Sequence, residues 1–214
     1  MGEKIVPNCY IFGGYIPEFR EELVREITEN DFVICADKGI ECAVSRGVKP
    51  DLIIGDFDSY KGNFPNDTEI ITLPVEKDDT DLHFAAKEGV KRGFTSFVLS
   101  GVTGGRIDMT YASINTLLYL FKRSESAVIM DKSVSIYITD SSVTVKKPEK
   151  DSHLSVFPLD GEAKGVRISG ATYNADNLDL MTDFPIGVSN SFKDDYALIS
   201  VKEGKILVMV TLKD

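Results

Sequence analysis

Several residue types that often carry function are scarce in this chain of 214 residues. It contains no tryptophan, two histidines (His83 and His153) and three cysteines (Cys9, Cys35 and Cys42). Two histidines without a Cys/His cluster argue against a zinc site and against a Ser-His-Asp catalytic apparatus. An odd number of cysteines without CxxC spacing indicates reduced, buried thiols, as expected of a cytoplasmic protein.

Long apolar runs and an excess of basic residues are also absent. No window approaches the roughly 18 apolar residues of a membrane helix. Pro7 and Asn8 interrupt the apolar stretch near the N-terminus, so we expect neither a signal peptide nor a membrane partner. The net charge is −10, and most of the excess acid lies in the first 131 residues. Because affinity for a phosphate backbone comes mainly from Lys and Arg, nucleic acid is not an expected partner.

The first 131 residues alternate two kinds of apolar pattern. Short runs typical of buried strands occur at 9–12, 32–36, 52–54, 69–73, 97–100 and 127–130. Between them, helical spacing predicts one helix from Pro17, a short one that ends at Arg46, one from near Asp81 and one over 109–121. This alternation predicts an α/β fold: a mostly parallel sheet flanked by helices on both faces.

Residues 132–214 have a different sequence pattern. Short β-rich runs separated by turn residues occur at 133–139, 142–146, 154–157, 166–169, 196–201 and 206–212. The segment 201–206 is typical of a tight hairpin. We therefore predict an α/β domain over 1–131 and an all-β sandwich or barrel over 132–214, with the least certain boundary within 124–140.

Charged residues follow several of the predicted strands of the first domain. The ends of parallel strands share one rim, and ligands bind in the crevice outside it. That rim would gather five acids and two cations: Asp56, Asp58, Asp79, Asp81, Asp108, Lys77 and Arg106. Hard oxygen ligands, cations and a glycine turn suit a metal-bound polyphosphate.

The sharpest motif is GDFDS, over 55–59. Asp56 and Asp58 can both face one Mg²⁺, and Gly55 permits a close backbone approach. The simpler alternative is that the two aspartates only support a turn. However, like charges this close are costly unless a cation sits between them.

The motif KDDTD, over 77–81, offers groups of both signs. Lys77 and Thr80 can donate to phosphate oxygens, and Asp79 or Asp81 can bind metal or accept a proton from an attacking hydroxyl. The alternative is that these acids only stabilise a helix N-terminus, with Asp81 as the N-cap.

A glycine-rich turn over 101–108 leads into the next predicted helix. The free N–H groups at a helix start favour anions. Arg106 adds the side chain best suited to bidentate contact with a phosphate. Asp108 either orients Arg106 or caps the helix.

At these residues the chain resembles the bacterial thiamine pyrophosphokinase (thiamine diphosphokinase) family. The matching stretches follow the family's order: PDLIIGDFDS (50–59), KDDTD (77–81), GGRID (104–108), SVFPL (155–159), GATY (170–173) and GVSNS (187–191). The resemblance implies an N-terminal domain that binds ATP and Mg²⁺ and a C-terminal domain that helps to bind thiamine. It also implies a cytoplasmic homodimer with active sites between subunits. The family transfers the β,γ-diphosphate unit of ATP to thiamine and releases AMP.

The resemblance also implies roles for individual residues. Four are implied as catalytic: Lys77, Asp81, Arg106 and Asp108. The metal would be held by Asp56, Asp58 and Asp81. ATP would contact Asp37, Thr80, Gly104, Gly105 and Arg106, and thiamine would contact Tyr173, Ser189 and Asn190.

Three positions, Lys38, Ile40 and Met109, depart from the family pattern, and three other functions stay open. ADKGI (36–40) replaces the usual Ala-Asp-Gly-Gly-Ala, and Met109 stands where histidine is common. The alternatives are diphosphate transfer to another small alcohol such as a hydroxymethylpterin, a non-catalytic nucleotide or thiamine sensor, and a nucleotide hydrolase.

Overall fold

The structure, a computed structural model, describes residues 6–58, 60, 62–76 and 78–213. The chain divides into two compact units, Met1–Lys132 and Ser133–Asp214. Lys77, predicted as catalytic, and Ser59 of the GDFDS motif lie outside the described residues.

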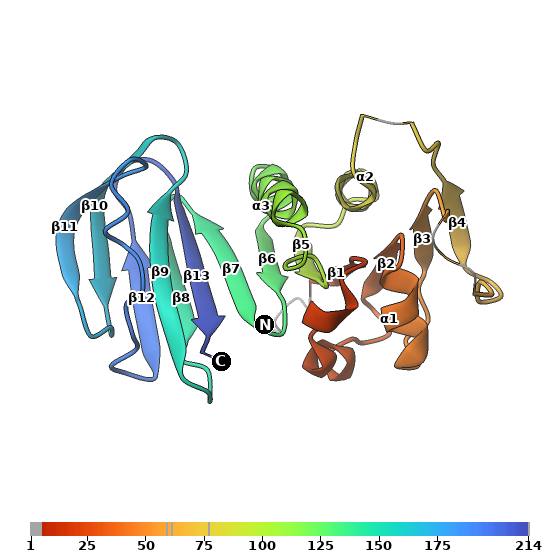
Figure 1. The fold of residues 1–214 in the computed structure, drawn as a ribbon, viewed down its shortest axis with the longest axis horizontal. Coiled ribbons are helices and arrows are strands. Elements are labelled where there is room, and N and C mark those ends of the chain that lie inside the picture. The colour runs from red at the N-terminus through yellow and green to blue at the C-terminus, as the bar shows by residue number, and fades with distance from the viewer. Residues whose placement is uncertain (1–5, 59, 61, 77, 214) are drawn as a thin grey trace, which may run out of the picture. The chain divides into compact units, whose positions relative to one another are not determined.

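The first unit is built on a parallel sheet. Its strands lie in the order β4 (Glu69–Thr72), β3 (Leu52–Gly55), β2 (Phe32–Ala36), β1 (Asn8–Phe12), β5 (Ser96–Ser100) and β6 (Ser126–Met130). The pairings of β1 with β2 and β5, of β3 with β2 and β4, and of β5 with β6 are all parallel. Three helices connect these strands (Figure 1): α1 (Gly39–Ser45), α2 (Asp81–Lys91) and α3 (Ile107–Phe121).

The chain order explains where a ligand can enter this sheet. From β1 the chain builds outward through β2 and β3 to β4, then returns to place β5 on the other side of β1. The connections on the two sides of β1 leave in opposite directions, so a crevice opens at the carboxyl ends of β1 and β5. The central strands are buried along nearly their whole length, because the sheet is covered on both faces.

The helix predicted from Pro17 is wrong. This segment forms two short 3₁₀ helices, Ile16–Glu18 and Glu21–Arg25. Its backbone is engaged by distant residues: Lys132 N donates to Glu18 O, and Arg20 N donates to Ser100 Oγ at 3.0 Å. These long-range bonds remove the groups that a continuous helix would need.

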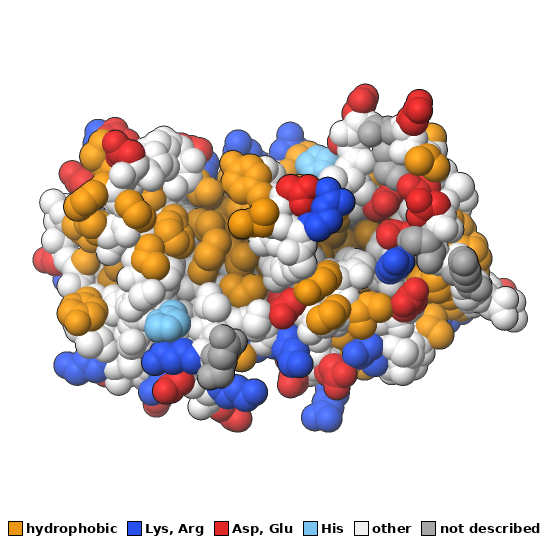
Figure 2. All heavy atoms as spheres, in the orientation of Figure 1, with side chains coloured by type: hydrophobic (Ala, Val, Ile, Leu, Met, Phe, Trp, Pro, Cys, Tyr) orange, Lys and Arg blue, Asp and Glu red, His pale blue; other side chains and the backbone are white. Residues whose placement is uncertain are grey.

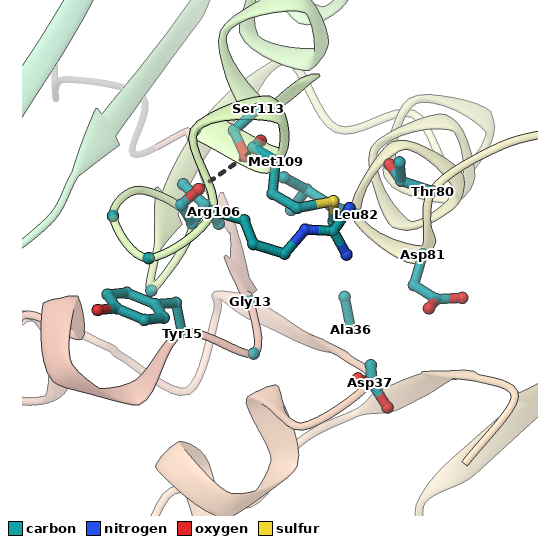
Figure 3. Close-up of a pocket in the computed structure, with 15 residues that line it drawn as sticks. Gly13, Tyr15, Ala36, Asp37, Thr80, Asp81, Leu82, Arg106, Met109 and Ser113 are labelled. Carbon is teal, nitrogen blue, oxygen red and sulfur yellow. Dashed lines mark hydrogen bonds between the residues drawn. The ribbon is translucent and has the colours of Figure 1, made fainter. Parts of the chain in front are cut away.

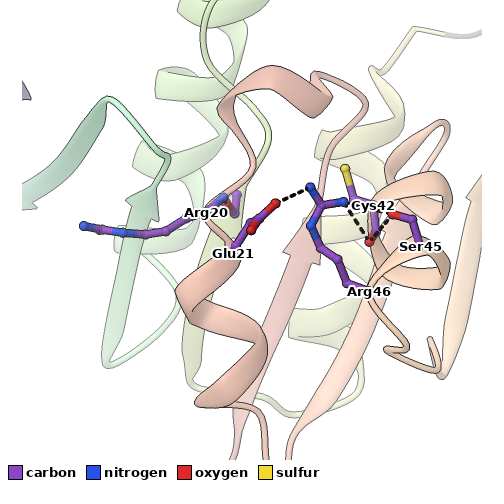
Figure 4. A network of polar contacts seen from close by, with 6 residues as sticks. Arg20, Glu21, Cys42, Ser45 and Arg46 are labelled. Carbon is purple, nitrogen blue, oxygen red and sulfur yellow. Dashed lines mark hydrogen bonds and ion pairs between the residues drawn. The ribbon is translucent and has the colours of Figure 1, made fainter. Parts of the chain in front are cut away.

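Side-chain contacts attach the second 3₁₀ helix to α1 (Figure 4). The Arg46 guanidinium pairs with Glu21 at 2.9 Å, donates to Cys42 O at 3.4 Å, and lies 4.8 Å from the centre of the Phe19 ring. The apolar face predicted for this helix consists of Phe19, Leu23, Val24 and Ile27. Phe19 and Leu23 are buried, and Val24 and Ile27 are partly buried against the same core. The hydrophobic pattern therefore identified the buried side chains correctly but not the backbone conformation.

The second unit is a sandwich of two antiparallel sheets. One has the order β7 (Val134–Thr139), β13 (Ile206–Leu212), β9 (Ser152–Pro158). The other has the order β11 (Ala175–Met181), β10 (Glu162–Ser169), β12 (Tyr196–Ser200), β8 (Ser142–Lys146). Side chains of both sheets, such as Val156, Val208, Val166 and Ile199, share one core. The predicted fold class, α/β with an all-β part, is confirmed.

Two details of this unit differ from the sequence prediction. Strand β11 was not predicted, because ADNLDLM is largely polar and most of its residues are not buried. The predicted hairpin over 201–206 is wrong, since β12 and β13 belong to different sheets. The segment that connects β12 to β13 is bonded to the backbone of Lys164. Lys164 N donates to Glu203 O, and Lys164 O accepts from Lys202 N and Glu203 N.

No helix among the described residues is both long enough and apolar enough to span a membrane.

Candidate active site

A pocket of about 450 Å³ lies at the carboxyl ends of β1, β2 and β5. Its walls come from four segments of the first unit: Gly13–Tyr15 after β1, Ala36 and Asp37 at the end of β2, Thr80–Leu82 at the start of α2, and the turn between β5 and α3 with the first turns of α3. Figure 3 shows Arg106 extending from that turn over the pocket, with Asp37 and Asp81 together on one side and Tyr15 on the other. The crevice predicted from strand order is therefore present.

Three carboxylates beside this pocket form a candidate metal centre. One carboxylate oxygen from each of Asp37, Asp56 and Asp58 lies within 4.8 Å of the other two. Asp37 and Asp56 are half-buried and Asp58 is exposed. Figure 2 shows acidic side chains gathered near the ends of β2 and β3, the strands that these residues follow. Three hard oxygen donors this close together suit a divalent cation such as Mg²⁺.

The backbone around the three carboxylates is unusual in a way that brings the two loops together. Asp37 (φ 48°) and Phe57 (φ 57°) are both in the left-handed region, which non-glycine residues rarely adopt. A Cβ on Gly55 would lie 3.2 Å from Asp37 Cα, a contact tight enough that any larger residue would push the two loops slightly apart. Asp37 N donates to Ile54 O at 2.8 Å and joins the ends of β2 and β3.

Asp37 therefore belongs to two groups at once. It lines the pocket together with Asp81 and Arg106, and it also contributes to the acidic cluster with Asp56 and Asp58. Sequence reasoning assigned Asp37 to nucleotide binding only. The signal that could have identified it as a ligand is its position directly after a buried strand, the same position that singled out Asp56.

The acids of the KDDTD motif take separate places. Asp81 lines the pocket but is not part of the acidic cluster found among the described residues. The predicted N-cap is wrong: Thr80 caps α2 by accepting from His83 N at 3.1 Å, and Asp81 is the first helical residue. Asp79 is held in an ion pair by Lys87, which lowers the pKa of the carboxyl.

The glycine turn brings Arg106 to the pocket and pairs it with Asp108. Arg106 Nε donates to Asp108 Oδ1 at 3.1 Å, and one terminal nitrogen donates to Oδ2 at 2.5 Å. This hydrogen-bonded pair raises the pKa of Arg106 and lowers the pKa of Asp108. Asp108 also accepts from Met109 N at 3.0 Å. Of the two alternatives for Asp108, the structure shows the first, since Asp108 orients Arg106. The second is wrong, because Arg106 is the N-cap residue of α3, no side chain caps this helix, and Asp108 lies in its first turn.

Tyr15, which sequence reasoning missed, shapes the same turn. A Cβ on Gly104 would lie 2.6 Å from the Tyr15 ring, and a Cβ on Gly105 would lie 2.7 Å from it. The two glycines, both at positive φ, let the turn pass directly over this ring. The pair Gly13-Gly14 after β1 repeats the strand-then-glycine pattern and could have indicated that this loop belongs to the site.

In the second unit, the three residues predicted to contact thiamine form one local arrangement. Asn190 Oδ1 accepts from Tyr173 N at 3.0 Å, and Asn190 Nδ2 donates to Tyr173 O at 2.7 Å. Ser189 (φ 60°) donates from its N to Ser155 Oγ at 3.1 Å. Tyr173 is 75% exposed, so its aromatic ring is open to solvent.

Comparison with known protein families covers both units. The profile described as "Thiamin pyrophosphokinase, catalytic domain" matches residues 23–130, and the one described as "Thiamin pyrophosphokinase, vitamin B1 binding domain" matches residues 140–206. The chain belongs to the thiamin pyrophosphokinase family. The resemblance stated from the motifs is confirmed, and with it the prediction of a thiamine diphosphokinase.

Individual relatives of this family are distant in sequence but similar in fold. Thiamine pyrophosphokinase of Bacillus subtilis (strain 168) is 24% identical over 204 residues, which cover 91% of this chain and 95% of the relative. A crystal structure of the thiamine pyrophosphokinase from Bacillus subtilis has a TM-score of 0.85 at 20% identity, covering 97% of this chain and 100% of that chain.

Two further solved structures extend the likeness. The thiamin pyrophosphokinase of Geobacillus thermodenitrificans has a TM-score of 0.81 at 24% identity, covering 97% of this chain and 98% of that one. The yeast thiamin pyrophosphokinase has a TM-score of 0.77 at 16% identity, covering 99% and 88%. At these identities the likeness concerns the fold.

The cysteines of this thiamin pyrophosphokinase family member take no part in the site. Cys9, Cys35 and Cys42 are free and buried. Burial raises the pKa of the Cys9 and Cys35 thiols, and raises that of Cys42 to about 11. Protonated, buried thiols are poor nucleophiles and poor metal ligands, in agreement with the prediction of reduced, buried thiols.

Proposed function

We propose that the pocket of the first unit binds ATP with Mg²⁺, and that the chain transfers the diphosphate of ATP to thiamine to give thiamine diphosphate and AMP. The observation that carries this proposal is that Asp37 both lines the pocket and belongs to the acidic cluster with Asp56 and Asp58. Through Asp37, a cluster of three carboxylates adjoins a pocket that is also lined by the start of a helix and by an arginine. A cation-binding cluster next to an anion-binding turn suits a metal-bound polyphosphate.

We assign the cation to Asp37, Asp56 and Asp58, with Asp81 nearby in the pocket wall. When bound, Mg²⁺ would neutralise phosphate charge. Arg106, which lines the pocket from the turn between β5 and α3, would also neutralise phosphate charge. Asp108 takes two of its five N–H groups, so the guanidinium can still donate to phosphate oxygens. Thr80 and Gly105 would complete the phosphate contacts that the resemblance implies. Gly104, also implied there, is not included, because its N–H donates to Thr110 Oγ1 at 3.0 Å.

The transfer itself needs mainly positioning and charge neutralisation. Asp81 lines the pocket and is assigned the role of accepting the proton of the thiamine hydroxyl. Asp79 is a poorer choice, because Lys87 holds its carboxylate and lowers its pKa. A less basic carboxylate is a weaker proton acceptor.

Thiamine is assigned to Tyr173, Ser189 and Asn190 of the second unit. The exposed Tyr173 ring offers a face for an aromatic, cationic ligand. We also propose a homodimer, in which the second unit of one protomer completes the site of its partner. Exposed apolar side chains of this unit, such as Phe184 (63%), Ile186 (46%) and Val188 (46%), support an interface there.

The direct test is an assay for AMP and thiamine diphosphate formed from ATP, thiamine and Mg²⁺. Asp56→Asn should lower turnover by at least about 100-fold, because it removes a charge from the metal cluster while keeping the shape of the side chain. Near-normal turnover of this variant would remove Asp56 from the site. Turnover with a hydroxymethylpterin but not with thiamine, or AMP release without any acceptor, would contradict the proposal.

A further inference from the structure

One buried carboxylate is outside every role assigned so far. Asp131, directly after β6, is only 1% exposed. Its carboxylate accepts four hydrogen bonds, all from three successive residues of the turn after β5. The donors are Gly101 N at 2.6 Å, Val102 N at 3.1 Å, Thr103 N at 2.7 Å and Thr103 Oγ1 at 2.6 Å.

Successive backbone N–H groups that converge on one point form a nest that binds anions. In this turn the nest formed by residues 101–103 is filled by the protein's own carboxylate. Those N–H groups therefore point into the protein rather than toward a ligand. A phosphate in the pocket is left with the later part of the turn, Gly105, Arg106 and the start of α3.

The other polar groups of the turn are also fixed. Tyr15 N donates to Gly101 O at 2.9 Å, and Ser113 Oγ donates to Val102 O at 2.7 Å, the bond drawn in Figure 3. Thr110 Oγ1 accepts from Gly104 N at 3.0 Å. Asp131 accepts four further hydrogen bonds from the same turn, and it is the one charged residue among these partners. Without it, three buried N–H groups would lose their acceptor, which forces the turn to move.

Asp131 also ties this turn to the loop after β1. It forms a β-bridge with Phe19, and the next residue, Lys132, donates from its N to Glu18 O. The end of β6 is thus bonded both to the turn after β5, which lines the pocket, and to the segment that directly follows the pocket-lining residues Gly13–Tyr15. Burial raises the pKa of Asp131, and the four donors act against this rise.

We propose that Asp131 is a positioning residue for the diphosphate transfer. Its carboxylate holds residues 101–103 in the conformation that presents Gly105 and Arg106 to the phosphates of ATP. It does not touch the substrate. This inference rests on the proposed function, because it assumes that ATP occupies the pocket.

The test compares four variants of the full chain. Asp131→Asn keeps the size of the side chain. The new amide group cannot accept four hydrogen bonds, and its NH₂ group would face the N–H donors of the turn. Thr103→Val removes one of the four bonds, and Thr103→Ser restores it. Val33→Ala, in the buried part of β2, serves as a control for general destabilisation, because Val33 contributes no polar group to the turn.

We expect Asp131→Asn to weaken ATP binding and to lower kcat/KM for ATP about 10- to 100-fold, as small misplacements of positioning groups do. Thr103→Val should show a smaller loss and Thr103→Ser nearly none, while KM for thiamine stays unchanged in all three. ATP binding is measured directly by calorimetry, and stability by thermal unfolding. Faster amide hydrogen exchange at 101–105 is expected in Asp131→Asn alone.

Three results would overturn the inference. The first is a loss of activity in Asp131→Asn that is no larger than the loss in Val33→Ala. For this comparison each variant is assayed the same number of degrees below its own melting temperature. The second is tighter ATP binding, which would mean that the nest is a phosphate site blocked by Asp131. The third is unchanged hydrogen exchange at 101–105. If the wild-type protein bound no ATP, the proposed function would fail, and exchange would still decide whether Asp131 holds the turn.

Discussion

The side chain of Asn190 binds the backbone of Tyr173 as a neighbouring β-strand would. Oδ1 accepts from Tyr173 N at 3.0 Å, Nδ2 donates to Tyr173 O at 2.7 Å, and Oδ1 also accepts from Ser191 N at 2.9 Å. Most of the bonding capacity of the amide is used inside the protein. Asn190 therefore places the Tyr173 loop, in addition to any contact it makes with thiamine.

Replacing Asn190 should affect the acceptor substrate only. Asn190→Asp keeps the shape but removes the donor to Tyr173 O, so the loop and its aromatic ring lose their fixed position. We expect KM for thiamine to rise about tenfold, the effect of about 1.4 kcal/mol, with KM for ATP unchanged. Ser191→Ala, which leaves the backbone bond to Asn190 in place, is the matched control. Equal changes in both KM values would contradict this assignment.

The place of Asp37 in the three-carboxylate cluster leads to a prediction about metal affinity. Asp37→Asn removes one charge from the three-carboxylate cluster, so the Mg²⁺ concentration for half-maximal activity should rise by at least about tenfold. Binding of Mn²⁺, followed by calorimetry, should weaken in parallel. Asp79→Asn is the matched control, because Asp79 is paired with Lys87 and lies outside the cluster. If Asp79→Asn weakened metal binding as much as Asp37→Asn, the cluster would be wrongly composed.

The contact of Tyr15 with the glycine turn can be tested by a double mutant. Gly105→Ala places a methyl group 2.7 Å from the Tyr15 ring at a φ of +62°, so it should destabilise the fold by about 1–3 kcal/mol and reduce ATP binding. Tyr15→Ala in the same chain removes the clash but not the backbone strain. We expect the double mutant to recover part of the stability in chemical denaturation. Strictly additive losses would show that the ring and the turn are independent.

His83 should make stability depend on pH. Its Nδ1 lies 3.1 Å from Thr116 Oγ1, and its ring packs edge-on against Tyr119. Burial lowers its pKa; the Asp79 charge opposes this, and Lys87 and Arg123 add to it. The unfolded chain therefore binds the proton more tightly, and the free energy of unfolding falls as pH drops from about 6.5 through the lowered pKa.

His83→Gln removes this dependence. Urea denaturation at pH 7.5 and pH 5.0 should show a larger loss of stability for the wild type than for His83→Gln. His153→Gln, which changes the chain's other histidine in the second unit, is the control and should behave as the wild type does. A His83→Gln protein that loses as much stability as the wild type would refute this role for His83.

The sequence by itself determined the strands of the first unit and the chemistry at their ends. Apolar runs such as 32–36 and 52–54 are local signals, and the residues directly after them are fixed by the same spacing. For this reason GDFDS and GGRID could be assigned to one rim before any coordinates were known. The α/β class and the β-rich second unit follow from the same local patterns.

Only the tertiary structure decided which groups meet. Asp37 joins Asp56 and Asp58 because β2 and β3 are neighbours, which sequence spacing does not state. The predicted helix after Pro17 fails because Ser100 and Lys132, far along the chain, bond to its backbone. Asp131 fills the nest at 101–103 because β6 lies beside β5. In each case the deciding interaction is a hydrogen bond or charge contact between distant segments, and local propensity carries no information about such partners.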